Sequence, residues 1–172
     1  MFKLSWYGSH FYLNDFIDKN SCRRIMEIGV YNGENAVSMI KTAVKKHPAN
    51  EVEYYGFDFF HYYDKTQIER KLKTLGCKYI LFEGNSLNTV PEAVKFLPLM
   101  DIIFIDGGKA YNVALSDWEG SSSLMHDKTS VFVHNVGFLG VRKMIDTIPL
   151  DLYTVEVFHA NSEERVDLIK RR

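Results

Sequence analysis

Residues 27–33 read Glu-Ile-Gly-Val-Tyr-Asn-Gly, and this run constrains the fold more than any other feature of the chain. It follows a short apolar segment and precedes a segment, 34–47, with apolar residues at helical spacing. A strand, a glycine turn and a helix in this order are how an α/β domain holds a nucleotide-like ligand. The third glycine of the dinucleotide fingerprint is missing. Glu27, just before the first glycine, favours a cationic or hydroxyl-rich ligand group over a pyrophosphate, which a carboxylate would repel.

Strand-like and helix-like segments alternate along the rest of the chain. Apolar runs predict strands over 24–29, 52–58, 78–82, 101–106, 130–133, 152–159 and 165–169, and helices over 34–47, 64–75, 88–96, 112–125 and 141–148. The last two strands are joined by a short link, so we expect them to pair antiparallel. The chain is therefore predicted to be an α/β protein with a doubly wound Rossmann-like sheet of seven strands, mostly parallel, ending in an antiparallel hairpin strand. One domain is expected, with a short arm over 1–22 and a core over 23–172.

Composition narrows the class of protein. The 172 residues have a net charge of −1 and no basic run before the last three residues, which does not favour a nucleic-acid partner. Cys22 and Cys77 lack the spacing of a zinc or redox motif and are interpreted as reduced thiols. We see neither a secretion signal nor a membrane-spanning run, so we expect a cytoplasmic protein that makes no membrane contact.

Polar residues follow each of the first five predicted strands, at the edge where open α/β sheets bind ligands. In chain order they are Glu27, Gly29, Tyr31 and Gly33; Asp58; Asn85 and Ser86; Asp106, Gly107, Gly108 and Lys109; and His134 and Asn135. Asp58 ends the second strand, where a carboxylate can hold both hydroxyls of a ribose. An ordinary loop or helix-capping role is the alternative for it. The sequence thus predicts a ligand site built from several strand ends.

These motifs, in this order, resemble those of the class I S-adenosylmethionine-dependent methyltransferases. The resemblance runs from about residue 24 to the C-terminus. It implies that Glu27 and the turn from Gly29 to Gly33 hold the methionine part of the cofactor. It further implies that Asp58 binds the ribose, and that Ser86 with its neighbour Asn85 binds the adenine edge. Three more residues are predicted to contact the cofactor, two of them with a packing role as the alternative: Tyr31, Phe59 and Asp106.

Within that class the chain is most similar to small-molecule O-methyltransferases of the catechol type and their short relatives. Residues 104–111 resemble the place where that family has a metal-binding aspartate and, three residues on, a catalytic lysine, here Asp106 and Lys109. Residues 133–136 resemble the place of an Asp-Asn pair of metal ligands; Asn135 matches and His134 replaces the aspartate. Asp106, His134 and Asn135 are therefore predicted metal ligands. Losing one carboxylate shifts the preference from magnesium toward manganese or zinc.

Several roles stay open at this stage. Lys109 is a predicted catalytic base or a surface lysine, and His134 is a metal ligand, a catalytic base or a buried packing residue. Asp106 is a metal ligand or a residue that holds the glycine turn. A related group of bacterial, sugar-modifying methyltransferases has a histidine at the position of Lys109.

The predicted function is S-adenosylmethionine-dependent methyl transfer to a hydroxyl of a small molecule or sugar, either with or without the assistance of a divalent metal. The arm is shorter than the N-terminal helices of catechol-type enzymes, which is compatible with an open acceptor site or with closure by a second subunit in a homo-oligomer. The alternatives are a non-catalytic cofactor-binding protein, a methyltransferase acting on RNA or protein, and a nucleotide-dependent oxidoreductase. The missing glycine argues against the last.

Overall fold

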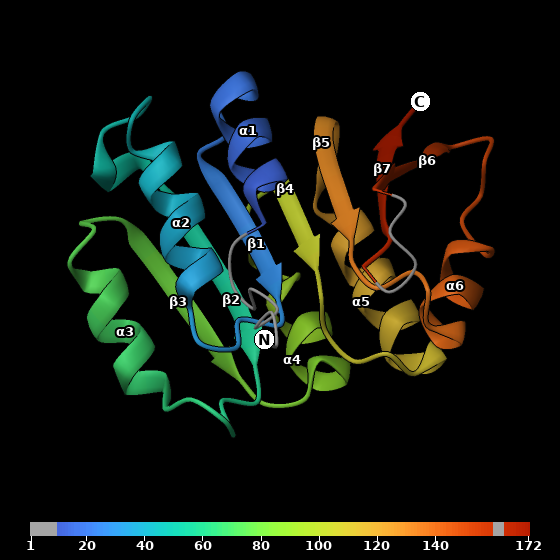
Figure 1. Cartoon of the computed structure of the whole chain (residues 1–172), viewed down its shortest axis with the longest axis horizontal. Helices are drawn as coiled ribbons and strands as arrows, with labels where there is room; N and C mark the ends of the chain where they lie inside the picture. Colours follow the sequence, from blue (N-terminus) through green and yellow to red (C-terminus); the bar gives the residue numbers. More distant parts are fainter. Residues whose placement is uncertain (1–9, 160–163) are drawn as a thin grey trace, which may run out of the picture.

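The chain folds into a seven-stranded sheet between two layers of helices (Figure 1). The structure, a computed structural model, describes residues 10–159 and 164–172. The elements in chain order are α1 (Phe11–Asn20), β1 (Arg24–Ile28), α2 (Glu34–Ala43), the 3₁₀ turn η1 (Ala49–Glu51), β2 (Glu53–Asp58), α3 (Lys65–Lys73), β3 (Lys78–Glu83), α4 (Ser86–Ala93), β4 (Met100–Ile105), α5 (Tyr111–Ser123), β5 (Met125–Val133), α6 (Leu139–Ile145), β6 (Tyr153–His159) and β7 (Val166–Arg171).

The strand order is β3-β2-β1-β4-β5-β7-β6. Strands β1 to β5 pair in parallel, and β7 runs antiparallel to both β5 and β6. This confirms the predicted doubly wound sheet with its reversed C-terminal strand. The order changes direction at β1 and β4, so the chain leaves these two neighbouring strands toward opposite sides of the sheet. Open α/β sheets bind ligands at such a switch point.

Alternating residues of the central strands face opposite layers. In β1, Ile25 packs with helices α1, α2 and α3, whereas Met26 and Ile28 pack with α4, α5 and α6. In β4, Ile102 and Phe104 face the first layer, and Ile103 and Ile105 face the second. Because both faces are covered, the central strands are mostly apolar, as expected for a parallel sheet.

Helix α1 is the main element that the sequence analysis did not predict. Its sequence, FYLNDFIDKN, has only two fully buried apolar residues, Leu13 and Ile17, one turn apart. Leu13 and Ile17 pack in the same apolar cluster as helix α2, which lies beside α1 in Figure 1. Strand β5 also starts earlier than predicted. The residues between Met125 and Ser130 are mostly polar, so they lack a strand pattern, and the pairing of β5 with β4 changes register there.

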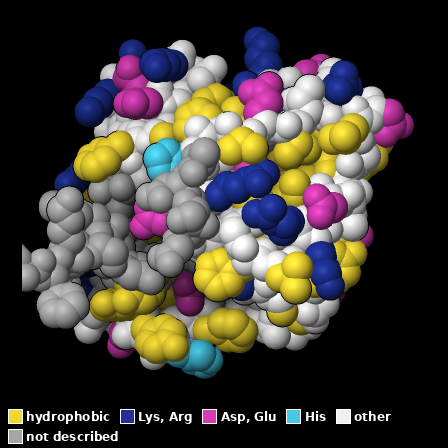
Figure 2. Space-filling model, turned by 45° about the vertical axis from the view of Figure 1, so that its right-hand side comes forward, with side chains coloured by type: hydrophobic (Ala, Val, Ile, Leu, Met, Phe, Trp, Pro, Cys, Tyr) yellow, Lys and Arg dark blue, Asp and Glu magenta, His cyan; other side chains and the backbone are white. Residues whose placement is uncertain are grey.

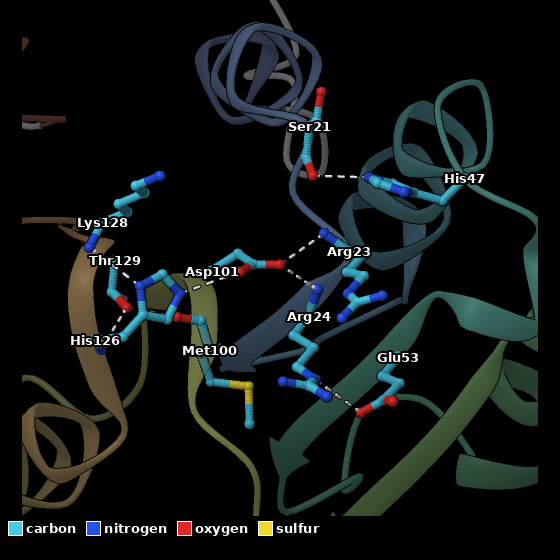
Figure 3. Close-up of polar contacts among 10 residues, drawn as sticks. All are labelled: Ser21, Arg23, Arg24, His47, Glu53, Met100, Asp101, His126, Lys128 and Thr129. Atoms are coloured by element: carbon cyan, nitrogen blue, oxygen red, sulfur yellow. Dashed lines mark hydrogen bonds and ion pairs between the residues drawn. The ribbon is translucent and has the colours of Figure 1, made fainter.

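A polar cluster fastens the amino ends of β1, β4 and β5 (Figure 3). One carboxylate oxygen of Asp101 accepts hydrogen bonds from the backbone amides of Arg23 and Arg24, at 2.8 and 2.9 Å. The other lies 3.1 Å from Nε2 of His126, whose Nδ1 accepts from the amide of Lys128. Burial opposes ionisation of Asp101, but the hydrogen bonds from these amides and from His126 outweigh it and lower the pKa of the carboxyl. This cluster lies at the opposite end of the strands from the predicted ligand site.

Cys22 and Cys77 are free thiols, as expected from their spacing. Burial raises the pKa of the Cys22 thiol to about 12, so it is a packing residue at neutral pH. Among the helices of the described ranges, none has the length and apolar character needed to cross a membrane.

Candidate functional site

A cleft of about 970 Å³ opens at the carboxyl edge of the sheet. Among its lining residues, those predicted for the site are Glu27, Gly29, Tyr31, Asp58, Phe59, Ser86, Asp106, Lys109, His134 and Asn135. Apolar side chains gather along the lower edge in Figure 2, the edge toward which β1 and β4 point in Figure 1. The exposed rings around the cleft belong to Tyr31, Phe59, Tyr62, Tyr63 and Phe138. The strand ends therefore meet in one cleft, as the sequence predicts.

Two predicted residues lie at helix starts outside the lining of this cleft. Asn85 is the N-cap of α4, and its side-chain oxygen accepts from the amide of Leu87 at 3.1 Å. Gly33 is the N-cap of α2 in a left-handed conformation, and a side chain there would press on Ile68. Both residues shape the turns that carry the lining residues. Sequence spacing alone did not separate a capping residue from a ligand contact.

The turn after β1 is held in place by its neighbours. Gly29 has a φ of +97°, and a side chain there would collide with the backbone carbonyl of Asp106. Asp58, at the end of β2, accepts hydrogen bonds from the amides of Tyr31 at 2.8 Å and Phe60 at 3.0 Å. Asp58 thus ties the glycine turn to the end of β2 and still lines the cleft.

Glu27 lies beneath the glycine turn and is 1% exposed. Its carboxyl group accepts hydrogen bonds from Asn35 Nδ2 at 2.6 Å and from the hydroxyl of Tyr54. Burial raises the pKa of Glu27 to about 8, and these hydrogen bonds limit the rise. The carboxyl is therefore mostly neutral at pH 7 in the unliganded protein, whereas the sequence analysis treated it as a carboxylate facing the turn.

The ends of β4 and β5 bring three predicted catalytic or metal-binding residues together. Oδ1 of Asp106 lies 2.5 Å from Nζ of Lys109 and 3.0 Å from Nδ1 of His134. Burial opposes ionisation of Asp106, but the hydrogen bond from His134 and the charge of Lys109 outweigh it and lower the pKa of the carboxyl. Asp106 is thus ionised at neutral pH, and it fixes the orientation of both neighbours in the cleft.

His10, which the sequence analysis did not select, lies over this group. Its ring centroid is 4.8 Å from that of His134 and 4.8 Å from that of Phe104. Its backbone amide donates to Oδ1 of Asn35, the residue that also donates to Glu27. Burial, and then the nearby His134, lower the pKa of His10 to about 4, so its ring is neutral at pH 7. Its position depends on α1, so no local motif could have revealed it.

Asp117 of α5 lies directly behind the cleft. It is fully buried, and in the described part of the chain neither of its carboxylate oxygens has a hydrogen-bond partner. Burial raises the pKa of Asp117 to about 6, although the nearby Ser86 hydroxyl and Lys109 ammonium lower it. A side chain at Gly107 would approach an oxygen of Asp117 to 2.9 Å, which explains the glycine at that position.

A family model described as "Methyltransferase domain" matches residues 26–136. That span includes the glycine turn, Asp58, Asp106, Lys109 and His134. The chain therefore belongs to this methyltransferase family, and its fold is that of the class I S-adenosylmethionine-dependent methyltransferases. A sequence search among curated proteins finds no significant match.

Solved structures of O-methyltransferases share the fold at low sequence identity. An O-methyltransferase from Bacillus cereus, in complex with SAH, has a TM-score of 0.76 and 16% identity over 94% of this chain and 79% of that one. TomG from Streptomyces achromogenes, involved in tomaymycin synthesis and in complex with SAM, has a TM-score of 0.72 and 15% identity over 93% and 77%. CalS11, a TDP-rhamnose 3′-O-methyltransferase, has a TM-score of 0.75 and 16% identity over 94% and 76%.

Proposed function

We propose that this protein transfers the methyl group of S-adenosylmethionine to a hydroxyl of a small molecule or sugar. The observation that supports this most is the group formed by Asp106, Lys109 and His134, which shares one cleft with the glycine turn and Asp58. One half of the cleft thus suits the cofactor and the other contains groups that can handle a proton. Two structural neighbours support an O-directed reaction: TomG is an O-methyltransferase involved in tomaymycin synthesis, and CalS11 is a TDP-rhamnose 3′-O-methyltransferase.

The cofactor is proposed to lie across the ends of β1 and β2. The turn at Gly29 brings the backbone close to the ligand, and Asp58 accepts from the ribose hydroxyls. Tyr31 and Ser86 line the same half, and Phe59 offers an exposed ring for the adenine. Asp58 already accepts hydrogen bonds from two backbone amides. Its carboxylate is therefore held in a fixed orientation before the ribose binds.

The acceptor hydroxyl is proposed to lie beside His134. Methyl transfer forms a carbon–oxygen bond as the carbon–sulfur bond breaks, the sulfonium becomes a thioether, and the hydroxyl proton must leave. Because Asp106 is ionised, His134 donates from Nδ1 to it, which leaves Nε2 able to accept that proton. Lys109 is the second candidate base, once its ammonium has left Asp106 and lost a proton to solvent. The wide cleft and its aromatic rim suit an acceptor of the size of a sugar or an aromatic natural product.

Calorimetric titration with S-adenosylmethionine, with and without EDTA, tests the cofactor half. We expect binding at micromolar strength, and about 10- to 100-fold weaker binding for Asp58→Ala, the loss expected for a hydrogen bond to a charged group. The matched control is Asp64→Ala, because Asp64 is an exposed helix cap outside the cleft lining. A folded protein that does not bind the cofactor would overturn the proposal and favour a different ligand.

The acceptor half is tested by methyl transfer from labelled cofactor to a panel of catechols, flavonoids and nucleotide sugars. Product formation that depends on His134 or Lys109 would support hydroxyl methylation. Cofactor binding without methylation of any hydroxyl compound, together with labelling of RNA or protein, would contradict the proposed acceptor class.

A further inference from the structure

His10 adds a third metal-binding side chain to the group at the ends of β4 and β5. One ligand atom from each of His10, Asp106 and His134 lies within 4.8 Å of the other two. The three side chains come from the segment before α1, from the turn after β4 and from the turn after β5. All three residues line the cleft, so an ion from solvent can reach them.

The set of donor atoms discriminates between classes of metal ion. Two imidazoles and one carboxylate suit zinc and similar transition metals, which take nitrogen and oxygen ligands in a tetrahedral site with one position left for water or substrate. Magnesium instead requires an octahedral shell of oxygens, and this group offers a single carboxylate. The residues therefore fit a zinc-class ion and do not fit magnesium.

We propose that His10, Asp106 and His134 together bind one divalent ion of the zinc class in the acceptor half of the cleft. His10 takes the place that the sequence analysis assigned to Asn135. Two ligands about 2.0 to 2.2 Å from a tetrahedral ion lie roughly 3.4 Å apart. Nδ1 of His134 is already 3.0 Å from Oδ1 of Asp106, and no ligand atom of the three is more than 4.8 Å from another. The binding of the ion stands on these three residues alone. Its role in catalysis rests on the proposed methyl transfer.

Lys109 competes with the ion. Its Nζ lies 2.5 Å from the same Asp106 oxygen that faces His134, and an ammonium group repels a divalent cation at that distance. The ion therefore displaces the lysine from Oδ1, and the released amine remains in the cleft beside the acceptor. A bound zinc-class ion would lower the pKa of a coordinated hydroxyl, and Lys109 could accept the released proton once its own ammonium has given up a proton to solvent.

Tyr12 packs beside His10 and has a buried hydroxyl. Within the described ranges this hydroxyl has no hydrogen-bond partner. Its ring centroid lies 5.4 Å from that of His10. Buried hydroxyls are nearly always hydrogen-bonded to protein, water or a ligand.

The test is a titration of the EDTA-treated and dialysed full chain with Co²⁺, followed by visible absorption, and then with Zn²⁺ in competition. We expect the absorption of a tetrahedral cobalt site and one ion per chain. His10→Ala and His134→Ala should each weaken Zn²⁺ binding by more than about 100-fold, beyond the effect of losing an outer-shell partner. Lys109→Met should strengthen it, because the competing ammonium is gone.

His126→Ala is the matched control, because His126 contacts Asp101 at 3.1 Å at the other end of the same two strands. We expect it to bind Zn²⁺ as the wild type does. Wild-type affinity in His10→Ala, or loss of binding in Asn135→Ala with His10→Ala unaffected, would overturn the assignment of His10. Cofactor titration in EDTA on the same samples separates the two proposals: intact cofactor binding with no metal binding rejects this inference alone.

Discussion

Strands β4 and β5 are joined by an aspartate–histidine pair at each end, and the two pairs differ in what else surrounds them. At the amino end, Asp101 and His126 lie 3.1 Å apart, and backbone amides fill the remaining positions on both side chains (Figure 3). At the carboxyl end, Asp106 and His134 lie 3.0 Å apart in a cleft, and the second partner of Asp106 is the flexible side chain of Lys109.

The difference shows that the same chemical pair takes its role from its place on the sheet. Backbone amides cannot leave Asp101, so that pair can only hold strands together. A lysine can leave Asp106, and among the described residues the ring of His134 makes no hydrogen bond other than the one from Nδ1 to Asp106. The carboxyl-end pair can therefore exchange partners with a ligand, as expected at the switch point of an α/β sheet.

Replacing Asp106 should have the largest effect on function. Asp106→Asn removes the charge that orients His134 and Lys109, so we expect methyl transfer to slow by about 100-fold or more, the usual range for lost acid–base assistance. Initial rates at saturating cofactor and thermal melting measure this. The comparison fails if Asp101→Asn, measured beside it, slows the reaction equally in folded protein.

Asp117 extends the comparison to an aspartate with neither amide partners nor a cleft. Its carboxyl pKa is about 6 in the folded chain against a usual value of 3.8, so ionisation at pH 7 opposes folding. We expect Asp117→Asn to stabilise the protein at pH 7 by up to about 3 kcal/mol, because the pKa is raised by about two and each pKa unit corresponds to about 1.4 kcal/mol.

The pH dependence of the same variant gives an independent check. The folded wild type binds a proton as the pH falls through 6, so its disadvantage relative to Asp117→Asn should shrink between pH 7 and pH 4. Urea unfolding at several pH values measures the difference. An Asn variant that is less stable at pH 7 would show instead that the carboxylate has a partner which stabilises its charge.

At the amino end the expected effect has the opposite sign. Asp101→Asn loses the charge that accepts from the amides of Arg23 and Arg24, and we expect a loss of about 1.5 kcal/mol, typical of a hydrogen bond to a charged group. Because the pKa of Asp101 is lowered in the folded chain, its contribution is present above the unfolded pKa near 3.8 and is lost as the pH falls below it. Unfolding by urea should therefore show a smaller difference between the two proteins at pH 3 than at pH 7.

The sequence predicted the carboxyl-end group better than the amino-end one because strand ends carry a recognisable pattern. Asp106, Lys109 and His134 follow apolar strands directly, so the sheet topology places them together. His126 lies inside a polar stretch that hid the start of β5, and His10 is positioned by a helix with only two buried apolar residues. Asp117 shows no signal in sequence, because its burial depends on how α5 packs.

Glu27 shows a further limit, since the sequence identified its place but not its protonation. Asn35 and Tyr54 both donate hydrogen bonds to Glu27, which favours the ionised carboxylate. Complete burial nevertheless keeps the carboxyl group of Glu27 mostly neutral at pH 7. The sequence pattern shows that Glu27 lies at the end of a strand. The desolvation of its carboxyl group, however, depends on the layer of helices that covers the strand. Here that layer is helix α2, which supplies Asn35.

The smallest predicted effect concerns the pH dependence of cofactor binding. It tests whether Glu27 has a structural role, as Asp101 does, or interacts with the ligand, as proposed for Asp106. A cationic methionine ammonium nearby would favour the ionised form of Glu27, so cofactor binding should release a proton below pH 8. Affinity should then rise with pH between 6 and 8, by no more than about tenfold per pH unit for one proton.

Glu27→Gln cannot ionise, and calorimetry of both proteins across that range separates this effect from titration of the cofactor's own amine. The difference between the two slopes is the contribution of Glu27. Equal slopes would mean that cofactor binding does not change the protonation of Glu27, and that burial and its contacts with Asn35 and Tyr54 set its charge in both states. In that case Glu27 would have a structural role, and the part of this segment that contacts the cofactor would begin at Gly29, directly after β1.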